Sequence, residues 1–376
     1  MLLGLLGTPA VWIVTSRIPT STHRADLPGL EQRLRRHVEA LAGIGPRSPS
    51  RPQGLREAAE YITSEWRQLG YKVRAQTYTH DRNDTDPSND LEVSNLEVVV
   101  PGSDARSSSS IVIGAHYDTV AGTPGADDNA TGVAVLLELS RAVSGARPGS
   151  TLRLVAFVCE EPPSFQTQNM GSWQYARERA DSEEPVKIAI SLESLGYYSD
   201  EEGSQQYPAP LGAFYPSRGN FIGIVGNVGM RSHVDRLARL LAEHGAPPVE
   251  TAALPSALPG IGWSDHWSFW QFGIPAVMVT DTAPYRNPHY HAPTDTPDTL
   301  DYATLAQLTA AWPAVALALT DGDRQPGWSR GMKAFGAWVL FLGLLLVVNI
   351  IIEVRQIRKT PSRSPTVEAE PSGGSE

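Results

Sequence analysis

Hydrophobic and polar residues are arranged along this chain in blocks that predict strands and helices in alternation. Short apolar runs rich in β-branched residues predict buried strands at 111–113, 152–158, 186–192 and 275–280. Other strands are expected at 71–78, 91–100 and 221–225. Apolar residues spaced three and four apart predict an amphipathic helix at 55–69, and helices are also expected at 30–41, 131–142, 232–244 and 302–319. This alternation predicts an α/β fold with a mostly parallel, twisted sheet and helices on both faces.

An uncharged apolar segment at 334–352 stands apart from this pattern. At about 1.5 Å per residue its nineteen residues span about 28 Å, which matches the hydrocarbon core of a bilayer. Residues 353–376 are rich in Ser, Pro, Gly and Glu after a basic start, which is typical of a disordered tail. The sequence therefore predicts a C-terminal transmembrane helix that follows a single domain at 25–325.

The charges around the apolar segment indicate its orientation. The basic residues after it outnumber those before it: Arg355, Arg358, Lys359 and Arg363 against Arg330 and Lys333. The positive-inside rule then places the tail in the cytoplasm and the domain on the extracytoplasmic side of the membrane. Residues 1–24 are a second apolar segment, a candidate signal anchor, but Pro9 and the lack of a basic start are atypical. Whether it is cleaved or inserted, the domain lies outside.

The overall charge excludes one class of partner. The formal net charge is −10, and Lys and Arg form no stripe along the chain. Because nucleic-acid binding needs a basic surface, no nucleic-acid partner is expected. The single cysteine, Cys159, rules out an internal disulfide, and its place in an apolar run favours a small core residue over a nucleophile.

Metal-ligating side chains gather where the predicted strands end. His116 and Asp118 follow the strand at 111–113, and Asp127 and Asp128 come soon after them. The next strands lead into the adjacent pair Glu160 and Glu161 and into Glu193, and a Pro-rich loop further on carries Tyr290 and His291. Open α/β sheets bind ligands at this edge. Imidazole and carboxylate groups are ligands that zinc accepts.

A site for two metal ions needs about four or five ligands, with one carboxylate bridging the ions. The chain offers five for this purpose: His116, Asp128, Glu161, Glu193 and His291. Glu160 would then be left without a metal, beside the site, where a general base is needed. The pattern therefore predicts a metal-dependent hydrolytic centre.

These motifs resemble the co-catalytic zinc peptidases of clan MH, which include bacterial leucyl-type aminopeptidases, glutamate carboxypeptidase II and glutaminyl cyclases. The resemblance covers about residues 30–320 and rests on several separate segments. They are His116-x-Asp118, Gly125-Ala-Asp-Asp-Asn-Ala-Thr-Gly132, the Glu160-Glu161 pair, Met170-Gly-Ser172, Ser264-Asp-His266, Gly273-Ile-Pro-Ala276 and Tyr290-His291 before Asp295-Thr296.

The resemblance implies a role for each site residue. It implies two zinc ions per chain, one bound by His116 and Glu193, the other by Glu161 and His291, with Asp128 bridging both. Glu160 matches the catalytic base, which would take a proton from a metal-bound water. Asp118 matches the carboxylate that orients the ligand imidazole. Tyr290 could donate to the oxyanion. The peptide bond after the bridging residue is cis in related enzymes, so a cis Asp128–Asn129 bond is expected.

The sequence departs from many relatives at two places. Glu193 stands where many have Asp, and Pro162-Pro163 follows the Glu pair where they often have Gly-Leu. Neither change removes a ligand. The implied function is a membrane-anchored zinc exopeptidase, an aminopeptidase acting on peptides. A carboxypeptidase or dipeptidase, a glutaminyl cyclase and a non-catalytic binding domain remain alternatives. A carboxypeptidase would need a cation for the substrate carboxylate, for which Arg218, Arg231 and Arg286 are candidates.

Several nearby residues have a simpler interpretation. His266 is equally consistent with a core hydrogen bond and with polarising a carbonyl, and His289 is expected to face away from the metals. Asp127 is expected to be structural, because the alignment of Thr131-Gly132 places the bridge at Asp128. The tryptophans at 263, 267 and 270 are expected in the core or in a pocket wall.

Overall fold

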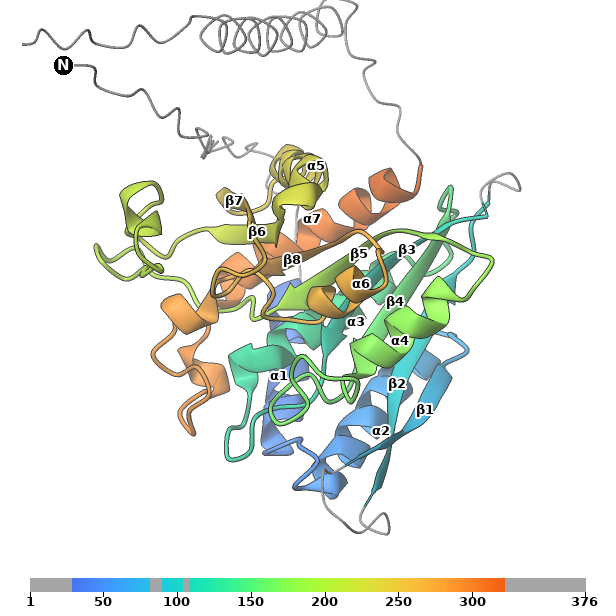
Figure 1. Cartoon of the computed structure of the whole chain (residues 1–376). Coiled ribbons are helices and arrows are strands. Elements are labelled where there is room, and N and C mark those ends of the chain that lie inside the picture. Colours follow the sequence, from blue (N-terminus) through green and yellow to red (C-terminus); the bar gives the residue numbers. More distant parts are fainter. Residues whose placement is uncertain (1–28, 82–89, 104–107, 322–376) are drawn as a thin grey trace, which may run out of the picture. The chain divides into compact units, whose positions relative to one another are not determined.

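The computed structural model describes residues 29–81, 90–103 and 108–321 (Figure 1). One eight-stranded sheet runs through this part of the chain in the order β1-β2-β4-β3-β5-β8-β6-β7. The strands are β1 Arg74–His80, β2 Leu91–Val100, β3 Ser110–His116, β4 Thr151–Phe157, β5 Val186–Glu193, β6 Ile222–Asn227, β7 Val249–Leu254 and β8 Ala276–Thr280. The helices are α1 Leu30–Gly43, α2 Pro52–Gln68, α3 Gly132–Ala142, α4 Gly171–Ala180, α5 Arg231–Glu243, α6 His266–Gln271 and α7 Tyr302–Thr320.

The predicted fold class is confirmed, with a mixed rather than fully parallel sheet. The central strands β4, β3, β5 and β8 are mutually parallel, and β7 is parallel to β6. Antiparallel pairing joins β1 to β2, β2 to β4 and β6 to β8. The four central strands therefore end at one edge of the sheet, where open α/β sheets place their sites.

Helices cover both faces of the sheet. On one face α1, α2, α3, α5 and α7 contact one another and the strands, while α4 and α6 pack together on the other face, in front of the sheet in Figure 1. The larger apolar core lies under the five helices and includes Leu34, Ile62, Leu136 and Trp312, all fully buried. A smaller core around Phe157, Tyr175 and Phe269 lies under α4 and α6. Burying apolar residues on both faces stabilises the central strands, which are nearly continuous apolar runs.

Helix α7 is the one helix among the described residues that is long and apolar enough to cross a membrane. Pro313 lies inside it, as expected, and eleven of its residues are buried, so it behaves as a core helix of this domain. The predicted transmembrane helix at 334–352, the segment 1–24 and the tail 353–376 all lie outside the described residues.

The sequence patterns missed three elements and misplaced one. Strand β7 and helices α4 and α6 are absent from the predicted set, and β1 begins and ends later than the expected 71–78. In α4 the buried positions include Gly171 and Ser172, so there is no apolar stripe to recognise. Helix α6 has only six residues, too few for a periodic signal.

Candidate metal centre

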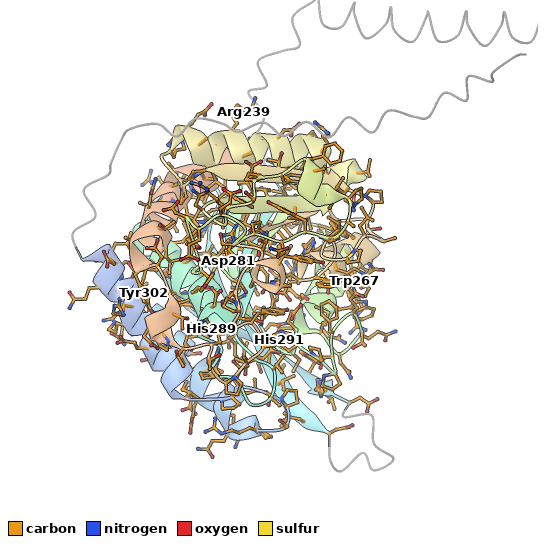
Figure 2. The ribbon with its side chains drawn as sticks, turned by 90° about the vertical axis from the view of Figure 1, so that its left-hand side faces the viewer. Arg239, Trp267, Asp281, His289, His291 and Tyr302 are labelled. Atoms are coloured by element: carbon orange, nitrogen blue, oxygen red, sulfur yellow. The ribbon has the colours of Figure 1, made fainter. Side chains whose placement is uncertain are left out.

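The predicted ligands come together at the carboxyl edge of the central strands. His116 is the last residue of β3 and Glu193 the last of β5, while Glu161 follows β4. Asp128 lies at a non-helical kink in the segment Ala126–Thr131 before α3, and His291 lies in the loop between β8 and α7 (Figure 2). Parallel pairing of β3 with both β4 and β5 brings the first three segments to one edge.

The carboxylate of Asp128 divides this cluster into two halves. Its Oδ1 lies 3.3 Å from His116 Nε2, which is also 3.2 Å from Glu193 Oε2. Its Oδ2 lies 3.1 Å from His291 Nε2, which is 3.3 Å from Glu161 Oε2. One oxygen of Asp128 thus belongs to each half, as the geometry of a bridging ligand requires.

These spacings fit metal ligands. Bonds of about 2.0–2.2 Å at tetrahedral angles place two ligand atoms roughly 3.3–3.6 Å apart. His116, Asp128 and Glu161 offer ligand atoms that all lie within 4.8 Å of one another. In addition, His116 Nε2 and Asp128 Oδ1 are buried without a hydrogen-bond partner among the described residues. A buried nitrogen and oxygen left without partners are costly unless something binds them, and a cation between them would do so.

Asp118 holds the acidic pair in place. Its Oδ1 accepts the backbone N–H of Glu160 and its Oδ2 that of Glu161, each at 3.1 Å. The same carboxylate lies 3.5 Å from His116 Nδ1, whose nearer neighbour is the Asp118 carbonyl at 3.2 Å. Asp118 therefore contacts the segment that carries Glu161 as well as the imidazole of His116.

Asp295 supports the bridging residue in a similar way, which the sequence did not predict. Its carboxylate accepts the backbone N–H groups of Asp127 at 2.9 Å and Asp128 at 3.2 Å. The Asp128–Asn129 peptide bond is cis, as expected. Asn129 in turn bonds the chain around β5, through Leu192 O and the N–H of Ser194.

Arg47 is a second support that no sequence motif indicated. Its fully buried guanidinium donates to the carbonyls of Leu41, Tyr117, Pro124 and Gly125 at 2.6–3.0 Å. These last three carbonyls lie in the loop between His116 and Asp128. Burial lowers the pKa of Arg47 to about 10, while the carboxylates of Asp118 and Asp295 oppose that shift. The guanidinium stays charged at neutral pH, and its hydrogen bonds link α1 to the loop between His116 and Asp128.

The centre is electrostatically crowded. Burial raises the pKa of Glu160 well above its usual range; His116 opposes this, and the carboxylates of Glu161 and Glu193 add to it. Burial, and then the charge of Asp128, raise the pKa of Glu161 to about 8. For His291, burial lowers the pKa, but hydrogen bonds with Asp128 and Glu161 outweigh it and raise the pKa to about 10. A divalent cation among these carboxylates would relieve their repulsion.

Tyr290 lies against the predicted ligand His291. The two rings stack with centroids 3.8 Å apart. Burial, and then the carboxylates of Asp128 and Glu161, raise the pKa of the Tyr290 phenol above its usual range. The phenol therefore keeps its proton and can donate a hydrogen bond.

Four neighbouring residues are placed outside the centre. His266 Nε2 lies 2.8 Å from Ile261 O in the core, and burial lowers its pKa to about 4. His289 points to Thr294 Oγ1 at 3.0 Å, on the same loop as His291 (Figure 2). Asp127 accepts from Gly196 N and Asn287 Nδ2, which is a structural arrangement. Cys159 is buried in the main core, as expected.

A cleft opens beside the centre. It encloses about 810 Å³, including its mouth, and adjoins the centre at Glu193 and Tyr290. Its floor comes from β6, β7 and β8 and its walls from the loops at 205–221, 259–263 and 282–285. Trp263 forms part of the wall, whereas Trp270 donates from the core to Ala276 O.

The three candidate arginines lie elsewhere. Arg286 is buried and donates to Gln205 Oε1 at 2.8 Å and to the carbonyls of Tyr197 and Phe221. Arg218 pairs with exposed Glu202 at 3.0 Å, and Arg231 lies 3.6 Å from Asp235. Among the described residues, no Lys, Arg or His lines the cleft.

Comparison with known proteins places this centre in a family. The model of peptidase family M28 matches residues 95–316. The chain belongs to peptidase family M28. The family membership confirms the resemblance to the co-catalytic zinc peptidases and makes the protein a zinc metallo-exopeptidase.

The chain is also similar to individual known proteins. The chain is 37% identical over 308 residues to the uncharacterized protein YfbL of Escherichia coli, covering 79% of this chain and 89% of YfbL. It is 25% identical to a probable leucine aminopeptidase of Trichophyton verrucosum, covering 72% and 68% of the two chains. The structure of BSAP, a zinc aminopeptidase from Bacillus subtilis, matches with a TM-score of 0.61 at 16% identity, over 78% of this chain and 96% of that one. At that identity the structural match concerns the fold.

Proposed function

We propose that this M28 peptidase is a membrane-anchored aminopeptidase that holds two zinc ions and removes N-terminal residues from extracytoplasmic peptides. The observation that carries the proposal is the position of Asp128, whose two oxygens face separate ligand clusters. His116 and Glu193 would complete one zinc site, and Glu161 and His291 the other.

Two zinc ions, when bound there, would acidify a water molecule and polarise the carbonyl of the scissile bond. Glu160 lies next in sequence to the ligand Glu161, and its N–H is held by Asp118. Its buried carboxylate accepts the proton of the attacking water and returns it to the leaving amine. The protonated Tyr290 donates to the oxygen on which negative charge develops.

The surroundings of the cleft favour an aminopeptidase over a carboxypeptidase. A carboxypeptidase must hold the terminal carboxylate of its substrate, and Arg218, Arg231 and Arg286 lie outside the lining of the cleft. The acidic residues Glu193 and Glu250 line the cleft instead, and an acidic lining attracts a free α-amino group and repels a carboxylate.

Hydrolysis tests this proposal most directly. Full-length protein in detergent is assayed on aminoacyl anilides and on N-blocked peptides, beside Glu160→Gln and a control, Glu39→Gln, at an exposed position of α1. We expect cleavage of free N-termini alone, two zinc ions per chain in all three proteins, and loss of turnover in Glu160→Gln only.

The other outcomes identify the alternatives. Cleavage restricted to N-blocked substrates indicates a carboxypeptidase. One zinc ion per chain with cyclisation of N-terminal glutamine indicates a glutaminyl cyclase. Two zinc ions without turnover indicate a binding domain.

The membrane anchor rests on the sequence of 334–352 and its flanking charges. Protease added to sealed, right-side-out vesicles should digest the catalytic domain and spare an epitope placed after residue 376. Digestion of the epitope with protection of the domain would reverse the proposed orientation, and recovery of the intact protein in the soluble fraction would exclude the anchor.

A further inference from the structure

The cleft beside the metal centre is lined by six aromatic side chains. They are Tyr207, Tyr215, Phe221, Trp263, Tyr285 and Tyr290. We infer that the cleft binds the side chain of the first substrate residue and selects a large aromatic one. This inference rests on the proposed aminopeptidase function and specifies its substrate class.

The position of the cleft links it to the reacting bond. Glu193, a proposed zinc ligand, and Tyr290, which stacks on His291, both line it. A substrate whose first carbonyl lies at the metals has its first side chain only one carbon away. That side chain must then enter the space next to these two residues.

The walls suit a flat ring. Trp263 and Tyr285 stack with an interplanar angle of 14°, and Tyr207 and Tyr215 stack at 25°. Trp263 keeps 41% of its surface exposed, so part of its indole is free to contact a ligand in the cleft. Ring-on-ring contacts add to the gain from burying apolar area, so an aromatic side chain gains more here than an aliphatic one.

The aromatic walls are fixed before any ligand binds. Tyr207 donates from its hydroxyl to Pro216 O at 2.7 Å, and Tyr215 donates to Thr251 O at 3.0 Å. The N–H of Gln206 donates to Tyr285 O at 2.8 Å, which ties the two walls together. Because the rings are held, binding costs less ordering of side chains, which strengthens selection by shape.

Gly223 of β6 sets the depth of the cleft. It lies on the floor between β7 and β8, opposite Glu250 and Thr280. A Cβ added there would meet Thr280 O and Thr282 Cγ2 at 3.3 Å, so the remainder of any larger side chain would have to project into the cleft. A side chain at this position would remove the space needed by a ring.

The charges that line the cleft also limit which substrate side chains it can bind. The acidic residues Glu193 and Glu250 line the cleft, and no basic residue among those described does. An acidic substrate side chain would be repelled there. Since Glu250 lies at the floor, a substrate with a long cationic side chain is the rival that the experiment must separate.

The first experiment compares aminoacyl anilides of Ala, Leu, Phe, Lys and Glu on the full-length protein. We expect kcat/KM for Phe to exceed that for Ala by about 100-fold and that for Leu by several-fold, a range typical of apolar pockets. Equal rates for Ala and Phe, or a preference for Leu or Lys, would overturn the aromatic assignment while leaving the aminopeptidase intact. Cleavage of none of the five would overturn both.

A pair of variants then tests whether the cleft is the part of the protein that selects the substrate side chain. Gly223→Leu should lower kcat/KM for Phe by roughly 10–100-fold and leave that for Ala within about threefold. The control, Ala253→Leu, adds a similar bulk to β7 at a residue that does not line the cleft, and should leave the ratio unchanged. Gly223→Val gives a smaller change where Gly223→Leu fails to fold. Equal loss for Ala and Phe in a folded Gly223 variant would contradict the inference.

Binding gives a readout that is independent of turnover. L-phenylalaninol should bind Glu160→Gln at least about tenfold more tightly than L-alaninol in calorimetry, and Trp263→Ala should reduce that difference. Equal binding of the two amino alcohols would contradict the inference.

Discussion

Asp118 Oδ1 accepts the backbone N–H of Glu160 at 3.1 Å, so a residue two positions after the predicted ligand His116 positions the predicted base, which follows a neighbouring strand. Its other oxygen holds Glu161 in the same way. Two strand ends, after β3 and after β4, are thereby fixed relative to each other by one carboxylate. A shift of the Asp118 carboxylate would therefore displace both the predicted base Glu160 and the predicted ligand Glu161.

Asp118→Asn tests this relationship. The amide keeps the shape but loses the charge, and it can present an acceptor to only one of the two N–H groups. We expect kcat/KM and zinc affinity each to fall about 10–100-fold, as for other residues that support a metal ligand. The control is Asp298→Asn at an exposed position, which should change neither quantity. Unchanged zinc affinity in Asp118→Asn would contradict the prediction.

Substitution of the two histidines in the loop before α7 should have different effects on zinc content. His291→Ala removes a predicted ligand and should leave about one tightly bound zinc ion per chain, with loss of hydrolysis. His289→Ala, two residues away, should keep both ions because His289 contacts Thr294 instead. Metal analysis after dialysis measures the count, and equal zinc content in the two variants would contradict the assignment.

Removing the metal should destabilise the whole domain. Ions that bind only the folded state add about 3–4 kcal/mol at 100–1,000 times their Kd. Chelation should therefore lower the midpoint of thermal unfolding, and added zinc should restore both stability and hydrolysis. If chelated His291→Ala and chelated wild type still differed in stability, that difference would come from packing and not from metal.

Arg47→Met should weaken the fold. The substitution leaves the carbonyls of Tyr117 and Pro124 without their donor, and each such group costs about 1–3 kcal/mol. We expect the free energy of unfolding to fall by about 3 kcal/mol or more in urea titrations. Arg51→Met is the control, since that partly exposed guanidinium has one carbonyl partner, Pro46 O. Similar losses of stability for the two variants would show that the hydrogen bonds of Arg47 to four carbonyls do not stabilise the fold more than the single bond of Arg51 does.

Glu138 should make stability fall in acid. Burial raises its pKa, but hydrogen bonds with His37 and Arg33 outweigh it and lower the pKa to about 2 from 4.5. A depressed pKa means that the stabilisation is complete above the unfolded value and is lost as the pH falls from about 4.5 to 2. Glu138→Gln should be less stable than wild type at pH 7 by about 1–3 kcal/mol, and the gap should narrow at pH 3. Exposed Glu31→Gln provides the control, and a gap that stays constant with pH would exclude the charge as the cause.

The sequence indicated which predicted site residues would lie together more completely than it indicated the strands and helices around them. His116, Glu160 and Glu193 each follow an apolar run, and parallel strands that share an edge bring their ends together whatever the loops do. Strand β7 escaped prediction because its residues, Val249–Leu254, contain two alanines and a buried glutamate and give no clear alternation.

The sequence did not indicate how Arg47 and Asp295 support the site. Arg47 and Asp295 act through backbone groups of residues far away in sequence, so the identity of their partners carries no pattern. An isolated Arg or Asp in a polar loop usually faces solvent. Only the folded chain shows that these two are buried against the loop that carries Asp128.

The order of the site residues along the chain affects when the protein can become active. His116 and Asp128 are synthesised long before His291, and Asp295, which holds the backbone of Asp128, comes later still. A nascent chain that has not yet reached His291 contains the half of the centre around His116 but lacks the half around His291. The centre is therefore complete only when synthesis of the domain ends, so the chain cannot act as a peptidase before that point.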